Sequence, residues 1–281
     1  MSWSVGSRRR LRRLFLEGFS VMDVAEPLVS VDAERRSDEV RDLLEAEAFD
    51  LVGIRRAGRV VGYAQRDDLR AGTCGRYLRP FGPDDLVEET ASLRDAILSL
   101  GINHRCFVTV LGDPAAIVTV SDLEKPPTRM FLFGMITVLE ALMTGAIGQA
   151  YPDEGWQGIL TSGRLAKAKE LHAERRRRGQ AGTLVDCLQF SDKGRILLSL
   201  PAIADDPALL DGQSRKASKR ALQELETLRN NLAHSQQIIP DAWERIVRFS
   251  ARLEALLDAG PLDRVEPGTP PAGAPSDAPE G

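Results

Sequence analysis

The chain has 281 residues, of which 43% are hydrophobic and 28% are charged, and its formal net charge is −4. This length exceeds what one hydrophobic core usually supports, so we expect two domains. The slightly acidic balance excludes a globally basic nucleic-acid-binding protein, and any contact with RNA must come from local patches. The three cysteines are widely spaced without a CxxC pair. This spacing argues against a disulfide framework or a zinc site and favours a cytoplasmic protein.

Residues 1–17 form a basic N-terminal segment that carries five arginines between Arg8 and Arg13. The segment has no long apolar stretch, so it is not a secretory signal. A solvated tail and an arm that binds RNA or a membrane surface would both have this composition. The solvated tail is the simpler interpretation.

Residues 18–126 contain two similar units, which are offset by the 54 positions that separate Asp68 from Asp122. In each unit a helical pattern of apolar residues precedes two strand patterns around a turn, at Ala57-Gly58 in the first and at Gly112-Asp113-Pro114 in the second. A tandem β-α-β-β unit is the simplest account of this repetition. The expected strands cover residues 51–54, 60–64, 106–111 and 115–120.

Each unit closes with a strand that leads into an acidic helix start, and the second of these reads Ala116-Ile117-Val118-Thr119-Val120-Ser121-Asp122-Leu123. Here the chain resembles a cystathionine-β-synthase (CBS) domain pair, whose repeats end in a glycine, apolar residues, Thr-x-x-Asp and an apolar residue. The resemblance implies an α+β fold of tandem β-α-β-β-α units that bind an adenine nucleotide (AMP, ADP or ATP) as a regulatory ligand. It places the Thr119 hydroxyl against phosphate and the Asp122 carboxylate against the ribose hydroxyls.

The first unit departs from this pattern, because Gln65 stands where the CBS family has threonine and only Asp68 is retained. We therefore expect one intact nucleotide site, in the second unit. The alternative is that Asp68 and Asp122 only cap the helices that follow them. No metal cofactor is expected.

Residues 130–151 are almost wholly apolar and resemble a membrane span, with Glu140 as the only charge. A charge in the middle of a span costs about 2.5 to 3.5 kcal/mol on insertion scales. We therefore expect a helix that protein buries on all sides, and no membrane partner. A lone buried carboxylate is costly, so we expect Glu140 to pair with Arg229.

Residues 127–258 are expected to form an all-α domain, and residues 259–281, rich in Pro, Gly and Ala, a disordered tail. One helix of this domain contains the motif Arg229-Asn230-Asn231-Leu232-Ala233-His234. The motif resembles the signature of the HEPN superfamily, an arginine followed after four to six residues by histidine, often with asparagine beside the arginine. The resemblance implies a helical bundle that forms a homodimer and cleaves RNA without a metal ion. The helices are expected over residues 130–148, 162–178, 184–188, 192–200, 214–233 and 243–257.

On a regular helix Arg229 and His234 lie about 140° apart, at about 100° per residue, so one helix does not place both on one face. In a homodimer two copies of the motif can complete each other across a two-fold axis. His234 would then move a proton near neutral pH, Arg229 would stabilise charge on the phosphorane-like transition state, and Asn230 would orient the histidine or the substrate. The products would be a 2′,3′-cyclic phosphate and a free 5′-hydroxyl.

The sequence thus predicts a nucleotide-regulated, metal-independent endoribonuclease. The alternative for His234 is an exposed residue at a helix end that interacts with the terminal carbonyl groups. The corresponding alternative for the chain is a non-catalytic regulator, which binds an adenine nucleotide and uses its helical half to dimerise or to hold a partner.

Overall fold

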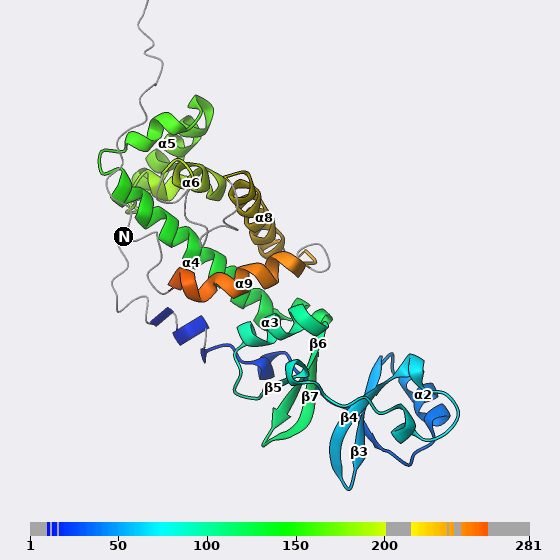
Figure 1. The fold of residues 1–281 in the computed structure, drawn as a ribbon. Coiled ribbons are helices and arrows are strands. Elements are labelled where there is room, and N and C mark those ends of the chain that lie inside the picture. The colour runs from blue at the N-terminus through cyan, green and yellow to red at the C-terminus, as the bar shows by residue number, and fades with distance from the viewer. Residues whose placement is uncertain are drawn as a thin grey trace, which may run out of the picture. The chain divides into compact units, whose positions relative to one another are not determined.

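The computed structural model describes residues 10–11, 13–15, 17–200, 215–234, 236–238 and 243–257 (Figure 1). Most of the expected basic segment 1–17 and the expected tail 259–281 lie outside these residues. The chain divides into two compact units, residues 14–130 and residues 131–281 together with 1–13. We call them the strand-rich unit and the helical unit and describe each by itself.

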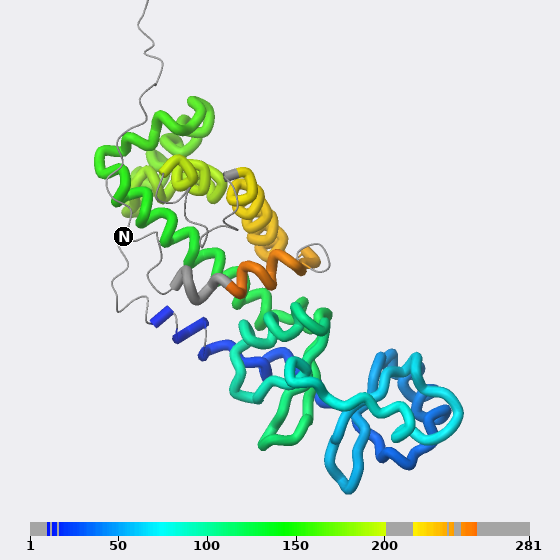
Figure 2. Tube along the Cα trace, viewed as in Figure 1, coloured from blue at the N-terminus to red at the C-terminus, as the bar shows by residue number. Residues whose placement is uncertain are grey.

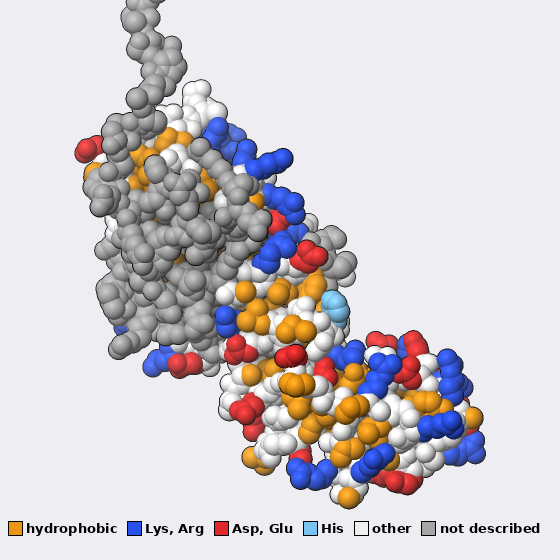
Figure 3. All heavy atoms as spheres, in the orientation of Figure 1, with side chains coloured by type: hydrophobic (Ala, Val, Ile, Leu, Met, Phe, Trp, Pro, Cys, Tyr) orange, Lys and Arg blue, Asp and Glu red, His pale blue; other side chains and the backbone are white. Residues whose placement is uncertain are grey.

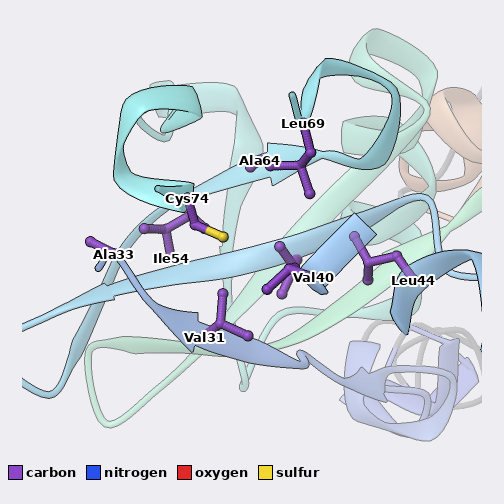
Figure 4. Packing of buried hydrophobic residues seen from close by; sticks show 9 residues of the cluster. Val31, Ala33, Val40, Leu44, Ile54, Ala64, Leu69 and Cys74 are labelled. Atoms are coloured by element: carbon purple, nitrogen blue, oxygen red, sulfur yellow. The ribbon is translucent and has the colours of Figure 1, made fainter. Parts of the chain in front are cut away.

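The first repeat of the strand-rich unit is a three-stranded sheet with one helix, and its strand order is β2-β3-β4. β2 pairs with β3 in parallel, and β3 pairs with β4 as an antiparallel hairpin. Val40 and Leu44 face the sheet from the helix and belong to the buried apolar cluster shown in Figure 4. The elements are β2 (Ser30–Asp32), α2 (Ser37–Ala46), β3 (Leu51–Arg56) and β4 (Arg59–Gln65).

The second repeat has the same element order, which confirms the tandem β-α-β-β prediction. Its helix begins at an N-cap, because Ser92 Oγ accepts the amide of Asp95 at 3.1 Å. The sheet has the order β1-β7-β6-β5, so a strand that precedes the first repeat completes the second (Figure 2). The elements are β1 (Glu26–Pro27), β5 (Leu86–Glu88), α3 (Leu93–Asn103), β6 (Arg105–Val110) and β7 (Asp113–Thr119).

The two hairpin turns lie at equivalent positions and share one backbone conformation. Ala57 and Gly58 have φ angles of 50° and 78°, and Leu111 and Gly112 have φ angles of 51° and 85°. Two central residues with positive φ are typical of the tight turns that match the twist of a hairpin, and glycine adopts this conformation without strain. The second turn lies one residue earlier than predicted, and β7 begins at Asp113.

The closing α-helix expected in each repeat is a short 3-10 turn instead, at Arg66–Asp68 and at Val120–Glu124. Proline disfavours the helical region for the residue before it, and Lys125, which precedes Pro126, is extended at φ −64° and ψ 149°. Proline is tolerated in the first turn of a helix, and the next helix, α4, begins at Pro126.

The two repeats meet through the equivalent strands β4 and β7 and through a cluster of aromatic rings. The centroid of the Phe107 ring lies 5.0 Å from that of Tyr63 and 4.7 Å from that of Phe81. Arg105 donates a hydrogen bond of 2.8 Å to the Tyr63 hydroxyl. Since Phe107 is fully buried, we infer that this cluster holds the repeats together.

The helical unit is all-α in the part of the chain that the structure describes, as predicted. Helices α6 and α8 pack closely, since a Cβ atom on Gly194 would lie only 2.7 Å from Leu222 Cδ1. The expected helix over residues 184–188 is a 3-10 turn at Val185–Cys187. The helices are α4 (Pro126–Ala150), α5 (Ser162–Arg177), α6 (Phe190–Leu197), α8 (Arg215–Ala233) and α9 (Trp243–Leu257).

Helix α4 is long and apolar enough to cross a membrane by length and composition, and half of its most apolar 18-residue window is buried inside the protein. The expectation of burial on all sides was wrong, because Phe133 remains 40% exposed. The side that faces protein includes the fully buried Phe131, Leu132 and Ile136.

Replacement of Phe107 by alanine should lower the free energy of unfolding of the strand-rich unit by about 3 to 5 kcal/mol, because it removes a buried ring and leaves a cavity. Native-state hydrogen exchange of the amides in β6 and β7 measures this loss. Leu111→Ala in the same hairpin is the control, since Leu111 is 94% exposed, and it should change the value by no more than about 0.5 kcal/mol. Equal effects of the two substitutions would contradict the role of the cluster.

Candidate functional site

The turn after β7 brings together Thr119 and Asp122, as the sequence predicted, but uses the carboxylate as a cap. Asp122 Oδ2 accepts the Thr119 amide at 2.7 Å and the Thr119 hydroxyl at 2.9 Å. Its other oxygen, Oδ1, lies 2.9 Å from Lys125 Nζ. Asp122 is only 9% exposed. The capping interpretation therefore describes what Asp122 does here, and its contact with a ribose stays a prediction.

Lys125 is a residue of this turn that the sequence analysis missed. Its ammonium group also donates to the carbonyl of Val24 at 2.6 Å and to the carboxylate of Glu26. Burial by itself would lower the pKa of Lys125, but the hydrogen bonds to Glu26 and Asp122 outweigh it and raise the pKa above its usual value. A permanent cation therefore lies beside Asp122. The sequence signal that could have identified Lys125 is its position three residues after Asp122, a spacing at which a lysine and a carboxylate can pair.

The equivalent turn after β4 has a different arrangement, because Gln65 replaces the capping threonine. Asp68 Oδ2 pairs with Arg79 Nη2 at 2.5 Å, and both side chains are well exposed, at 36% and 45%. The carboxylate of Asp68 is thus more accessible than that of Asp122. The expectation that only the second repeat has an intact nucleotide site stays a prediction.

Arg79 is held in place by the edge of β4. The amide of Tyr63 donates to the carbonyl of Arg79 at 3.0 Å, and the amide of Arg79 donates to the carbonyl of Tyr63 at 2.7 Å. A Cβ atom on Gly62 would lie 2.3 Å from the Arg79 carbonyl oxygen, so only glycine fits there. The glycine of the CBS-like pattern therefore allows the backbone approach that positions Arg79 beside Asp68.

The motif of the helical unit lies at the end of α8, where Ala233 is the last helical residue. The His234 amide donates to the Asn230 carbonyl at 3.0 Å, so helical geometry continues through the histidine. The side chains of Asn230 and His234 are exposed, whereas Arg229 turns towards α4. Within one chain the structure therefore brings Asn230 and His234 to one side of α8 and Arg229 to another.

The predicted pair between Arg229 and Glu140 is confirmed, with Nε and Oε2 3.9 Å apart. A closer cation was missed, because Lys193 Nζ lies 2.9 Å from Glu140 Oε1. The Lys193 side chain is only 5% exposed, whereas that of Arg229 is 42% exposed. Glu140 is thus neutralised mainly by Lys193, and the Arg229 side chain remains partly exposed.

Two further properties of the described residues concern other kinds of chemistry. They contain no group of three or more His, Cys, Asp or Glu side chains that could hold a metal ion. The three cysteines, Cys74, Cys106 and Cys187, are buried and unbonded. Burial raises the pKa of the Cys106 thiol to about 12, which makes it a poor nucleophile.

No family model and no curated protein matches this chain. Among solved structures, it is similar to the CBS domain of the bacterial CNNM/CorC family Mg²⁺ transporter, with 19% identity, a TM-score of 0.35, and 45% of this chain and 86% of that chain covered. The same domain in complex with ATP is 20% identical, with a TM-score of 0.34, and the match covers 43% of this chain and 94% of that chain. CBSX2 in complex with AMP is 20% identical, with a TM-score of 0.34, and the match covers 38% of this chain and 93% of that chain. All three are CBS domains, and none extends over half of this chain.

Replacement of Glu140 by glutamine should destabilise the helical unit by about 3 kcal/mol, because it leaves the ammonium of Lys193 buried without a counter-charge. Arg229→Gln should cost at most about 1 kcal/mol, since that pair is long and half exposed. Urea unfolding followed by tryptophan fluorescence is a suitable measurement, because Trp3, Trp156 and Trp243 all lie in the sequence range of the helical unit.

The double variant Glu140→Gln with Lys193→Met is the control for this assignment. It removes both charges and should regain most of the lost stability. If Arg229→Gln cost as much as Glu140→Gln, Lys193 would not be the main partner of Glu140.

Proposed function

We propose that this chain is an adenine-nucleotide sensor whose strand-rich unit binds AMP, ADP or ATP as a regulatory ligand. The observation that carries the proposal is that a carboxylate–cation pair follows each of two equivalent strands, although the cations come from different positions. Asp68 with Arg79 follows β4, and Asp122 with Lys125 follows β7. The ligand class is the one that the CBS resemblance of the sequence implies.

The chemistry of each pair suits a nucleotide. A carboxylate accepts hydrogen bonds from both hydroxyls of a ribose, and a neighbouring lysine or arginine binds phosphate. At the first pair a ligand competes with one ion pair between exposed side chains. At the second it competes for Asp122 with the amide and hydroxyl of Thr119 and with Lys125. We therefore expect the Asp68 site to bind more readily, with Thr119 and Asp122 as a second site.

Replacement of Asp68 by asparagine should weaken the binding of the preferred nucleotide by about tenfold or more, because a neutral amide accepts fewer ribose hydrogen bonds. Isothermal titration of the full chain with AMP, ADP and ATP measures the effect. Asp67→Asn is the matched control, since Asp67 is the adjacent acid and its side chain is 86% exposed. Asp122→Asn tests the second site and should also lower the thermal stability, because Asp122 is a cap.

Unchanged nucleotide affinity in both Asp68→Asn and Asp122→Asn would contradict the assignment of these turns. Absence of any binding by the unsubstituted chain would contradict the proposed ligand class.

A second candidate function is metal-independent cleavage of RNA by a homodimer of the helical unit. The observation that favours it is the exposure of Asn230 and His234 at the end of α8, where a substrate has access to them. In this reaction one His234 removes the proton of a 2′-hydroxyl, and the oxygen attacks the adjacent phosphorus. The bond to the 5′-oxygen breaks, and His234 of the second copy protonates that oxygen. Arg229 stabilises the charge on the phosphate oxygens.

His234→Ala and Arg229→Ala should each lower the rate of RNA cleavage at least about a hundredfold, the usual contribution of a general acid or base or of a charge-stabilising group. Gel analysis of a labelled single-stranded RNA and of tRNA, in the presence of a chelator, measures the rate and the cyclic phosphate end. His172→Ala is the control, because it removes a histidine of the same unit outside the motif. Cleavage that persists in His234→Ala would rule out the assignment, and nucleotide binding without any cleavage would favour a non-catalytic regulator.

A further inference from the structure

A positively charged cavity lies between α5, α6 and α8 of the helical unit. Its volume is about 560 Å³, within the range typical of ligand sites. Four cations line it, and Asp192 is the one acidic residue among its lining side chains. We call it the cationic cavity and define it by Arg164, Arg195, Lys216 and Lys219. Figure 3 shows Lys and Arg side chains gathered along the edge of the helical unit that α8 forms.

The single carboxylate of the cavity is already neutralised. Asp192, whose side chain is 6% exposed, lies 2.6 Å from Arg164 Nε. Arg164 also donates to Gln189 at 2.9 Å and to Ser191 at 3.1 Å, so its guanidinium group is firmly placed. Among the described residues, no ion pair involves the other three cations of the cavity, which are Arg195, Lys216 and Lys219.

The electrostatics of the helices account for Arg195 but not for Lys216. Arg195 lies in the last turn of α6, where a cation is favourable. Lys216 lies in the first turn of α8, where a cation opposes the helix dipole. Like charges that converge on one cavity also repel each other. An anion in the cavity would remove both penalties.

A second cavity of about 370 Å³ adjoins the first, because Arg164 and Asp192 line both. It adds Lys167 of α5 to the positive surface. The cations therefore form a run along two adjoining cavities rather than one compact cluster. A run of this kind suits a chain of successive phosphates better than a single phosphate group.

We propose that the cationic cavity and its neighbour bind a single-stranded nucleic acid through its phosphodiester backbone. None of the side chains that line either cavity is aromatic, so bases have no ring on which to stack. The available donors are the lysines and arginines together with Thr161, Gln189, Ser191 and Gln223, which are the types that contact phosphate and sugar. Binding should therefore depend on salt and hardly on base sequence.

The position of the cavity on α8 gives this binding a consequence for cleavage. At about 100° per residue, Lys216, Lys219 and Gln223 share one face of α8 with Asn230 and His234. Lys219 and Asn230 are separated by about 16 Å along the helix axis, at 1.5 Å per residue. A strand held in the cavity can reach the motif along this face, where it passes the carboxylate of Glu226, which the same periodicity places between Lys219 and Asn230. This last step rests on the proposed RNA cleavage, whereas the binding itself does not.

The test uses the full chain with His234→Ala, so that binding is measured without cleavage. Fluorescence anisotropy follows a labelled oligouridine and an oligothymidine of about 12 nucleotides, within the usual range of site sizes. Lys216→Gln with Lys219→Gln should weaken the binding of both by about tenfold or more. It should also lower the slope of log K against log salt concentration by about 1.4, since each lost phosphate contact of a single strand contributes about 0.7.

The matched control is Lys169→Gln with Arg70→Gln, which changes the net charge equally at exposed residues outside both cavities. It should leave the affinity within about twofold of the parent, since long-range charge is screened at physiological salt. The cavity variant should remain folded, because it removes a cation from the first turn of α8. Circular dichroism checks this point.

Loss of binding in the cavity variant alone supports the proposal for whichever strand shows it, and the comparison of oligouridine with oligothymidine identifies RNA or DNA as the natural source. Equal losses in both variants, or no loss in either, overturns it. Binding of ATP that depends on Lys216 and Lys219, without binding of either oligonucleotide, also overturns it in favour of a mononucleotide. If the chain binds RNA through the cavity but never cleaves it, the RNA-cleavage candidate fails and this inference stands.

Discussion

A carboxylate in the middle of an apolar helix needs a cation, and this requirement organises the helical unit. Glu140 of α4 meets Lys193 of α6 at 2.9 Å and Arg229 of α8 at 3.9 Å. Lys193 is almost fully buried, so neither charge is stable there without the other. Three helices far apart in the sequence are thus tied at one point. Arg229 turns towards that point, whereas Asn230 and His234 lie on a different, exposed side of α8.

The strand-rich unit shows what duplication preserves and what it allows to diverge. The hairpin turns and the positions of Asp68 and Asp122 are equivalent in the two repeats. The partners of the two carboxylates differ: Asp122 is a buried cap, and Asp68 pairs with the exposed Arg79. The two turns thus share their backbone geometry but differ in the partners of their carboxylates. This difference would allow the two turns to have separate roles.

Local patterns predicted the elements well, and tertiary pairing was beyond them. The helix over residues 243–257 was predicted to the residue, because its apolar period is regular. The sequence analysis missed β1, because a strand of two residues is too short to show an alternating pattern. Its pairing with β7 also depends on residues about 90 positions later in the chain. The sequence required a cation beside Glu140 but could not choose Lys193. Arg79 likewise lies beside Asp68 only because Gly62 lets two backbones approach.

The face of α8 gives the short motif at its end a physical context that the motif alone lacks. R-x4-H arises often by chance, and within one chain its arginine and histidine point in different directions. A helix that presents Lys216 and Lys219 at one end and Asn230 and His234 at the other, on one exposed face, could hold a polyanion along its length. Binding and chemistry would then lie about 16 Å apart on one rigid element. Arg229, held by Glu140 on the flank of that face, would reach a phosphate presented by a second copy more readily than one bound along its own helix.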